Sequence, residues 1–214
     1  IGVATNRDAW VYNFSTKEIE KNMKQTIEFY NEQWKGFAVA KAKNSKLTAE
    51  NFIDVDPVKI SCTVNLKKDL ERGKEHQYKK KEIKTGVYRP YTKQRLYFDK
   101  PFIERPGLSP KLFPNGKVEN KLITITGSGA SKDFSVLITK TITNLDAVEK
   151  AQCFPLYLYD ERQKSSPSLF DAAGESEYIR RDGVSDFILE RTKKVYGKNV
   201  SKEGIFYYIY GILH

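Results

Sequence analysis

The stretch from Lys74 to Arg95 constrains the structure and function of the chain most, because aromatic rings lie there among a high density of positive charge. It holds eight basic and two acidic residues, so +6 of the formal net charge of +10 falls within 22 residues. Tyr78, Tyr88 and Tyr91 lie between the cations. A surface that faces phosphates needs this combination, since cations attract polyanions and planar groups lie against sugars and bases. A solvated, lysine-rich loop is the alternative interpretation.

The residue types in this stretch predict which side chains would contact a nucleic-acid helix. Arginine, lysine and glutamine read guanine and adenine edges in the major groove. The candidates for base contacts of this kind are Arg89, Lys93, Gln94 and Arg95. Lysines on the same stretch would neutralise phosphates and set the register, and these are Lys79, Lys80, Lys81 and Lys84. Two further base-contact candidates lie in a polar turn near the start of the chain, Asn6 and Arg7.

Composition places the chain among globular proteins that interact with polyanions. Of its 214 residues, 39% are hydrophobic and 30% are charged, and the sequence pI is about 9.4. No apolar run approaches the roughly 20 residues of a membrane-spanning helix, so we expect a soluble, cytoplasmic protein with no membrane partner. Cys62 and Cys153 lie in apolar contexts and are predicted to be buried thiols. The chain starts with Ile1 and stops at His214 in the middle of a helical pattern, so we expect a piece excised from a longer polypeptide.

Hydrophobic periodicity predicts an α+β fold with a mixed or antiparallel sheet. Residues 1–14 show two-residue alternation about a polar turn and predict an N-terminal hairpin. A capping box, Ser15 with Glu18, opens a long helix that is expected to stop at Gly36. Two helices are predicted at the end of the chain, one over Asp186–Tyr196 and one that begins after Ser201.

Between these helices the chain reads mainly as strands and loops. Residues 59–64 and 94–99 have strand character, with a short helical turn at 66–73 between them. Three β-branched or aromatic runs predict a buried sheet, at 122–127, 134–139 and 153–160. Residues 163–174 read as a loop. We treat residues 1–214 as a single region.

Three sequence features invite a chemical interpretation. The run Gly127 to Lys132 resembles a phosphate loop but lacks the required spacing, so a plain turn is the better interpretation. A metal-dependent nuclease could use Asp69, Glu82 and Lys84, with carboxylates that hold a hydrated cation. His76 and His214 show no zinc-ligand spacing with the cysteines, so we assign no metal site and no catalytic residue.

Six segments in order resemble one family, the C-terminal specificity region of Type ISP restriction-modification enzymes. They read GVATNRDAWVYNFS, NLKKDLERGK, YRPYTKQRLYFD, FSVLIT, QCFPLYLYD and IFYYIYGILH. Such enzymes combine nuclease, ATP-driven translocase, adenine methyltransferase and target-recognition parts in one polypeptide. The resemblance therefore implies a target-recognition region that binds double-stranded DNA next to the methyltransferase domain of the same polypeptide.

The resemblance also bears on cofactors and catalysis. It implies S-adenosylmethionine, ATP and magnesium for the parent enzyme, and none for this stretch, which we expect to catalyse nothing by itself. Three alternatives remain open: the metal-dependent nuclease, a non-catalytic protein-interaction module, and RNA binding through the aromatic residues.

Overall fold

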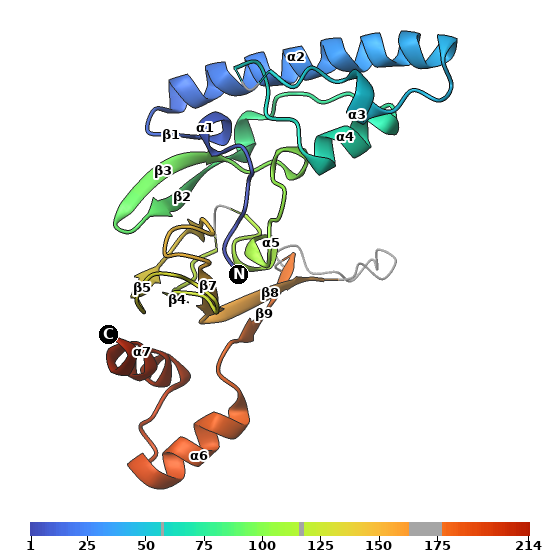
Figure 1. The fold of residues 1–214 in the computed structure, drawn as a ribbon. Coiled ribbons are helices and arrows are strands. Elements are labelled where there is room, and N and C mark those ends of the chain that lie inside the picture. Colours follow the sequence, from blue (N-terminus) through green and yellow to red (C-terminus); the bar gives the residue numbers. More distant parts are fainter. Residues whose placement is uncertain (57, 116–117, 163–176) are drawn as a thin grey trace, which may run out of the picture. The chain divides into compact units, whose positions relative to one another are not determined.

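The computed structural model describes residues 1–56, 58–115, 118–162 and 177–214. These residues form two compact units (Figure 1). The first unit comprises Val3–Gly107, and the second comprises Ile1–Gly2 with Leu108–His214. Helices and antiparallel strands occur in both, so the predicted α+β class is confirmed. The loop predicted at residues 163–174 lies outside the described residues.

The first unit is built around the long helix α2, Thr16–Lys43. Ser15 caps it, because its side chain accepts a hydrogen bond from the Glu18 backbone amide at 3.2 Å. Its buried stripe follows the predicted period: Ile19, Met23, Ile27 and Tyr30. The predicted stop at Gly36 is wrong, because Phe37 is also buried and the packed face continues past the glycine. Shorter helices complete the unit: α1 (Asp8–Val11), α3 (Ala49–Phe52), α4 (Val64–Glu71), η1 (Lys80–Glu82) and η2 (Lys100–Phe102).

The sheet of the first unit runs in the order β1–β3–β2. Its strands are β1 (Tyr12–Asn13), β2 (Ile83–Arg89) and β3 (Thr92–Tyr97), and every pairing is antiparallel. Pro90 and Tyr91 connect β2 to β3. A proline followed by a residue with positive φ is the pattern of a type II turn, and Tyr91 has φ +58°. The strand predicted at 94–99 is confirmed as part of β3, and α2 contacts both β1 and β3 (Figure 1).

Two further predictions for the first unit are wrong. Residues 1–14 form no hairpin; Ala4 pairs with Arg105, residues 8–11 form α1, and β1 pairs with β3. Residues 59–64 form no strand, because their polar groups bond to the N-terminal segment instead, and α4 begins at Val64. In both places the local sequence pattern predicted pairing with an adjacent strand. The hydrogen-bond partners come instead from distant parts of the chain.

The side chain of Arg7 ties the N-terminal segment to two others. It is 3% exposed, and its guanidinium donates to the carbonyl oxygens of Ser61 at 3.1 Å and Phe102 at 2.6 Å. It also donates to the Thr63 hydroxyl and lies 3.8 Å from a Glu104 carboxylate oxygen. Burial lowers the pKa of Arg7, and the charge of Glu104 opposes that shift.

The described residues of the second unit form two small sheets and three helices. A three-stranded antiparallel sheet has the order β5–β4–β7, and a two-stranded ribbon pairs β8 with β9. The strands of the second unit are β4 (Leu122–Ile125), β5 (Val136–Thr139), β6 (Ile142–Thr143), β7 (Gln152–Pro155), β8 (Tyr157–Glu161) and β9 (Tyr178–Asp182). Its helices are α5 (Ser109–Leu112), α6 (Asp186–Tyr196) and α7 (Lys202–Leu213).

The predicted C-terminal helices are confirmed, with Ser185 and Ser201 as their caps. Phe206 of α7 packs into a cluster with Ile123, Val136 and Leu156. α6 buries none of its residues. No helix in the described part of the chain has the length and apolar character needed to cross a bilayer.

Replacement of Arg7 tests its structural role. Arg7→Met should lower the free energy of unfolding of the first unit by about 3 kcal/mol or more, because it leaves buried carbonyls unsatisfied and Glu104 without its cation. Both tryptophans, Trp10 and Trp34, lie in this unit, so tryptophan fluorescence during urea denaturation reports on it alone. Arg105→Met, at an exposed arginine, is the control and should change stability by no more than about 0.5 kcal/mol. Equal effects of the two changes would contradict the role of Arg7.

Candidate nucleic-acid interface

The hairpin of β2 and β3 separates the predicted base-contact residues onto its two faces. Alternate residues of a strand point to opposite faces, and cross-strand partners share a face. Lys93 pairs with Val87, and Arg95 pairs with Thr85. Both cations are exposed, and Arg95 donates from Nη1 to the Thr85 hydroxyl at 3.0 Å. Lys93 and Arg95 therefore share one cationic face of the hairpin.

Gln94 lies on the other face. It pairs with Gly86 and is half-buried, next to the buried Leu96 two residues on. Lys84, which pairs with Leu96, shares this face, with its Nζ 5.2 Å from the centre of the Phe98 ring. The predicted base-contact set thus does not form one surface, because strand alternation divides it.

Aromatic residues mark the tip of the hairpin. Tyr91 is 88% exposed in the turn. The guanidinium of Arg89 lies over the Tyr88 ring, with Cζ 4.0 Å from the ring centre, and its Nη2 is 4.0 Å from a carboxylate oxygen of Asp8. Arg89 is thereby held at the tip by a neighbouring ring and an acidic group.

The predicted phosphate-contact lysines differ in how free their charges are. Lys79 lies 3.1 Å from a carboxylate oxygen of Asp99, so its charge is already paired. Lys80 and Lys81 are exposed on η1 and form no ion pair with any residue that the structure describes. These two lysines offer the free charge that a phosphate contact needs.

The two N-terminal candidates also differ. Asn6 is exposed, with φ +55°, and its carbonyl oxygen accepts a hydrogen bond from the Ser61 hydroxyl at 2.9 Å. Arg7 is interior, and its donors are used by Ser61, Phe102 and Thr63. The prediction that Arg7 reaches a base edge is therefore corrected: its donors hold the first unit together.

The proposed nuclease constellation does not gather around Asp69. The Asp69 carboxylate lies 3.2 Å from His76 Nε2 and 3.4 Å from Lys74 Nζ, in a cavity of about 530 Å³ whose lining omits Glu82 and Lys84. Burial lowers the pKa of His76, and the charge of Asp69 opposes this. Within the described ranges, no three His, Cys, Asp or Glu side chains could hold a metal ion.

The Gly127–Lys132 run forms a turn whose amides are already occupied. The Glu149 carboxylate accepts hydrogen bonds from the backbone amides of Ser131 at 3.0 Å and Lys132 at 2.9 Å, and these bonds lower the pKa of Glu149. A Cβ at Gly127 would lie 2.0 Å from the Lys150 carbonyl oxygen, so the close backbone approach requires glycine. A carboxylate thus fills the place that a phosphate would take in a phosphate loop.

Both cysteines are free thiols of intermediate exposure, so they are less buried than predicted. Burial is still the largest influence on the pKa of both thiols. It raises the pKa of Cys62 to about 11 and raises that of Cys153 as well.

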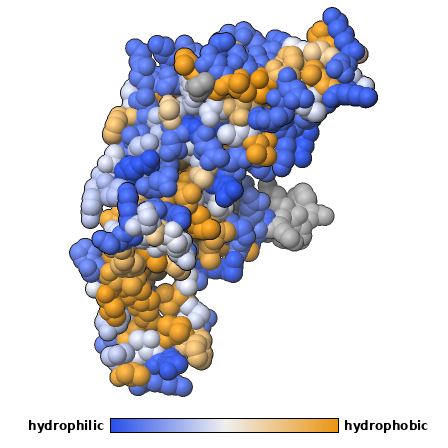
Figure 2. Space-filling model, viewed as in Figure 1, coloured by the Kyte–Doolittle hydropathy of each residue, from blue (hydrophilic) through white to orange (hydrophobic). Residues whose placement is uncertain are grey.

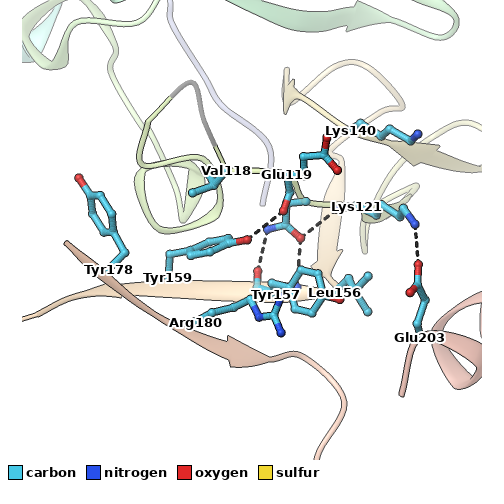
Figure 3. A pocket seen from close by; sticks show the side chains of 11 residues that line it. Val118, Glu119, Lys121, Lys140, Leu156, Tyr157, Tyr159, Tyr178, Arg180 and Glu203 are labelled. Atoms are coloured by element: carbon cyan, nitrogen blue, oxygen red, sulfur yellow. Dashed lines mark hydrogen bonds and ion pairs between the residues drawn. The ribbon is translucent and has the colours of Figure 1, made fainter. Parts of the chain in front are cut away.

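The sequence prediction missed a pocket in the second unit, shown in Figure 3. It has a volume of about 810 Å³ and is lined by aromatic and charged residues, among them Tyr157, Tyr159, Tyr178 and Arg180. The two-residue spacing of Tyr157 and Tyr159 was visible in the sequence. Their partner strand, β9, follows 16 residues after β8 ends and carries no such pattern of its own.

Apolar side chains gather on the surface of α6 and α7 (Figure 2). Val195 on α6 is 70% exposed, and Tyr208 and Ile212 on α7 are 65% and 66% exposed. Exposed apolar patches of this kind mark contact surfaces for other proteins. We call these residues, with Phe187, Ile188, Tyr196 and Ile209, the α6–α7 apolar surface.

Comparisons with known proteins identify a family and three similar solved structures. The family described as "Type ISP C-terminal specificity domain" matches residues 1–214. A cryo-EM structure of the DrdV–DNA complex matches with a TM-score of 0.81 and 30% identity, over 100% of this chain and 19% of that one. The ATP-dependent Type ISP restriction-modification enzyme LlaBIII bound to DNA matches with a TM-score of 0.77 and 27% identity, over 100% of this chain and 13% of that one.

A third solved structure is a nuclease-deletion mutant of the Type ISP restriction-modification enzyme LlaGI with a DNA substrate mimic. It matches with a TM-score of 0.76 and 27% identity, over 100% of this chain and 15% of that one. The chain thus spans less than a fifth of each of these solved chains. The comparison with curated proteins found no match. The chain belongs to the family of Type ISP C-terminal specificity domains.

Proposed function

We propose that this domain binds double-stranded DNA in a sequence-specific way and reads the target with the β2–β3 hairpin. The observation that carries this proposal is the cationic face of Lys93 and Arg95, which are exposed side by side on one strand. A two-stranded β-ribbon fits the major groove, where arginine and lysine pair with guanine. The three solved relatives are named as complexes with DNA or with a DNA substrate mimic.

The spacing of the two cations suits base reading. Residues i and i+2 of a strand lie about 7 Å apart, close to two base-pair steps of about 3.4 Å each. Lys93 and Arg95 would therefore address base pairs about two steps apart. Lys80 and Lys81, with their free charges, would contact phosphates and set the register.

Arg89, Gln94, Asn6, Lys79 and Lys84 have lesser roles in this proposal. Arg89 would contact DNA only if it leaves the Tyr88 ring. Gln94 and Lys84 lie on the opposite hairpin face, Asn6 lies on a separate loop, and Lys79 is paired with Asp99.

Membership of the family supports a proposal for the wider role. In the parent enzyme the domain would present one adenine to an adjoining N6-adenine methyltransferase, which extrudes the base from the stack. Its occupied or unoccupied state would bias the parent towards methylation or towards ATP-driven translocation and cleavage. S-adenosylmethionine, ATP and magnesium would act in those other parts, in the cytoplasm, while this domain would catalyse nothing itself.

A protein-interaction role is the second candidate, and the α6–α7 apolar surface favours it. The partner we assign is the methyltransferase domain of the same polypeptide. Both roles fit one domain, because the cationic face and the apolar surface belong to different units.

Arg95→Ala tests base reading. On the preferred site, identified by selection from a random duplex pool, it should cost about 1–3 kcal/mol of binding free energy and relax preference at one base pair. Lys93→Ala should relax preference at a different pair, about two steps away. Gln94→Ala is the matched control on the opposite face and should leave the preferred sequence unchanged. Equal losses on preferred and random duplexes would reduce Arg95 to a phosphate contact.

Lys80→Ala tests the phosphate contact. It should weaken binding to all duplexes alike and make the slope of log K against log salt shallower by about one, because one fewer counterion is released. Lys79→Ala removes the same charge next to Asp99 and should change the slope less, since that charge is paired. Titrations at several salt concentrations measure both slopes, and identical slopes for the two variants would contradict the assignment.

The apolar surface is tested by Val195→Ser combined with Ile212→Ser. Because both side chains are exposed, the double variant should change stability by no more than about 0.5 kcal/mol and should weaken binding to the separately purified methyltransferase domain of the parent polypeptide. Phe206→Ser, at a residue that is 3% exposed, is the control and should unfold the unit. Thermal melts by circular dichroism measure stability, and calorimetry with the methyltransferase domain measures binding. A large loss of stability in the double variant would show that these side chains belong to the core.

A further inference from the structure

The register of β8 and β9 places three tyrosines and an arginine on one face of the ribbon. Tyr159 pairs with Arg180, and Tyr178 pairs with Glu161, two residues after Tyr159. Tyr157 precedes Tyr159 by two residues and so shares its face. The Arg180 guanidinium lies over the Tyr157 ring, with Cζ 4.4 Å from its centre. This face forms one wall of the pocket in Figure 3.

The charges around the pocket are unequally engaged. Lys121 donates to Glu203 at 2.6 Å, so these two charges cancel (Figure 3). Arg180 and Lys140 form no ion pair with any residue in the described ranges. Glu119 contributes an exposed carboxylate, while its carbonyl oxygen accepts a hydrogen bond from the Tyr159 hydroxyl at 2.9 Å. Arg180, Lys140 and Glu119 therefore line the pocket without an ion pair among the described residues.

We propose that this pocket binds a single nucleotide that is not base-paired. Tyrosine rings stack on bases, and arginine adds a cation–π contribution. Arg180 and Lys140 supply positive charge for the phosphate, and the Glu119 carboxylate accepts a hydrogen bond from an exocyclic amino group of the base. The volume of about 810 Å³ lies within the usual range for small-ligand sites.

Glu119 narrows the ligand class. A carboxylate repels a plain polyanion, so a double-stranded backbone alone is a poor occupant. Adenine, cytosine and guanine carry an exocyclic amino donor, and thymine does not. The pocket should therefore prefer nucleotides of these three bases to thymidine.

Two sources share this chemistry, an unpaired nucleotide within DNA and a free nucleotide. The inference that DNA supplies the nucleotide rests on the proposed function, because it requires that this domain binds duplex DNA. A binding measurement with adenosine monophosphate alone tests whether the pocket takes a free nucleotide.

The experiment compares three labelled duplexes by fluorescence anisotropy with the 214-residue chain. One duplex is fully paired, one carries a single unpaired adenosine, and one carries a single unpaired thymidine. The unpaired adenosine should tighten binding about fivefold or more over the paired duplex, the lower end of what stacking one base contributes. The thymidine duplex should gain less, and Glu119→Gln should reduce the difference between the two.

Arg180→Ala should abolish the gain from the unpaired adenosine while leaving binding of the paired duplex nearly unchanged. Arg181→Ala is the matched control, because it removes the same charge from the neighbouring residue. Arg181 lies on the opposite face of the ribbon, where its Nε is 2.5 Å from a carboxylate oxygen of Asp160. If both variants lose the gain equally, the gain comes from the overall positive charge of the ribbon, and the proposal that the pocket binds the nucleotide is wrong.

The outcomes separate this inference from the proposed function. If the chain binds the paired duplex but gains nothing from the unpaired adenosine, and calorimetry detects no adenosine monophosphate binding, the pocket proposal fails while DNA binding stands. If adenosine monophosphate binds and Arg180→Ala removes that binding without any gain on the bulged duplex, the pocket takes free nucleotides. If no duplex binds, the proposed function fails, and calorimetry with adenosine monophosphate alone decides the pocket.

Discussion

The two-residue alternation of antiparallel strands is the constraint on which both surfaces of this domain depend. In β2–β3 it gathers Lys93 and Arg95 on one face and sends Gln94 to the other. In β8–β9 it gathers tyrosines and Arg180 on the face that lines the pocket. A shift of one residue in either register would exchange the faces, so the chemistry of each surface depends on the pairing as much as on its residue types.

Sequence reasoning succeeded where local patterns determine structure. The capping serines at Ser15, Ser185 and Ser201 and the apolar stripe of α2 predicted real helices, because both signals act within a few residues. The family resemblance was also correct. The cationic stretch lies at the surface for most of its length, since isolated lysine side chains are expensive to bury.

The failures share a physical cause, which is contact between distant segments. Arg7 resembled a surface arginine in a polar turn, yet its donors are satisfied by carbonyls more than fifty positions away. Gly36 resembled a helix stop, but the buried Phe37 sustains the helix. Lys79 and Lys80 are neighbours of the same type, and only the fold brings Asp99 to one of them. No spacing rule in a single sequence reports such partners.

The partners that sequence could not report also make the hairpin a firm support for recognition. The Lys79 backbone amide donates to the Tyr97 hydroxyl at 3.0 Å, the Phe98 amide donates to the Glu82 carbonyl at 2.7 Å, and Tyr78 stacks on Tyr97. These contacts join η1, which carries Lys80 and Lys81, to the end of β3, which carries Lys93 and Arg95. Phosphate contacts made by η1 would therefore fix the position of the base-reading strand, because both belong to one hydrogen-bonded unit.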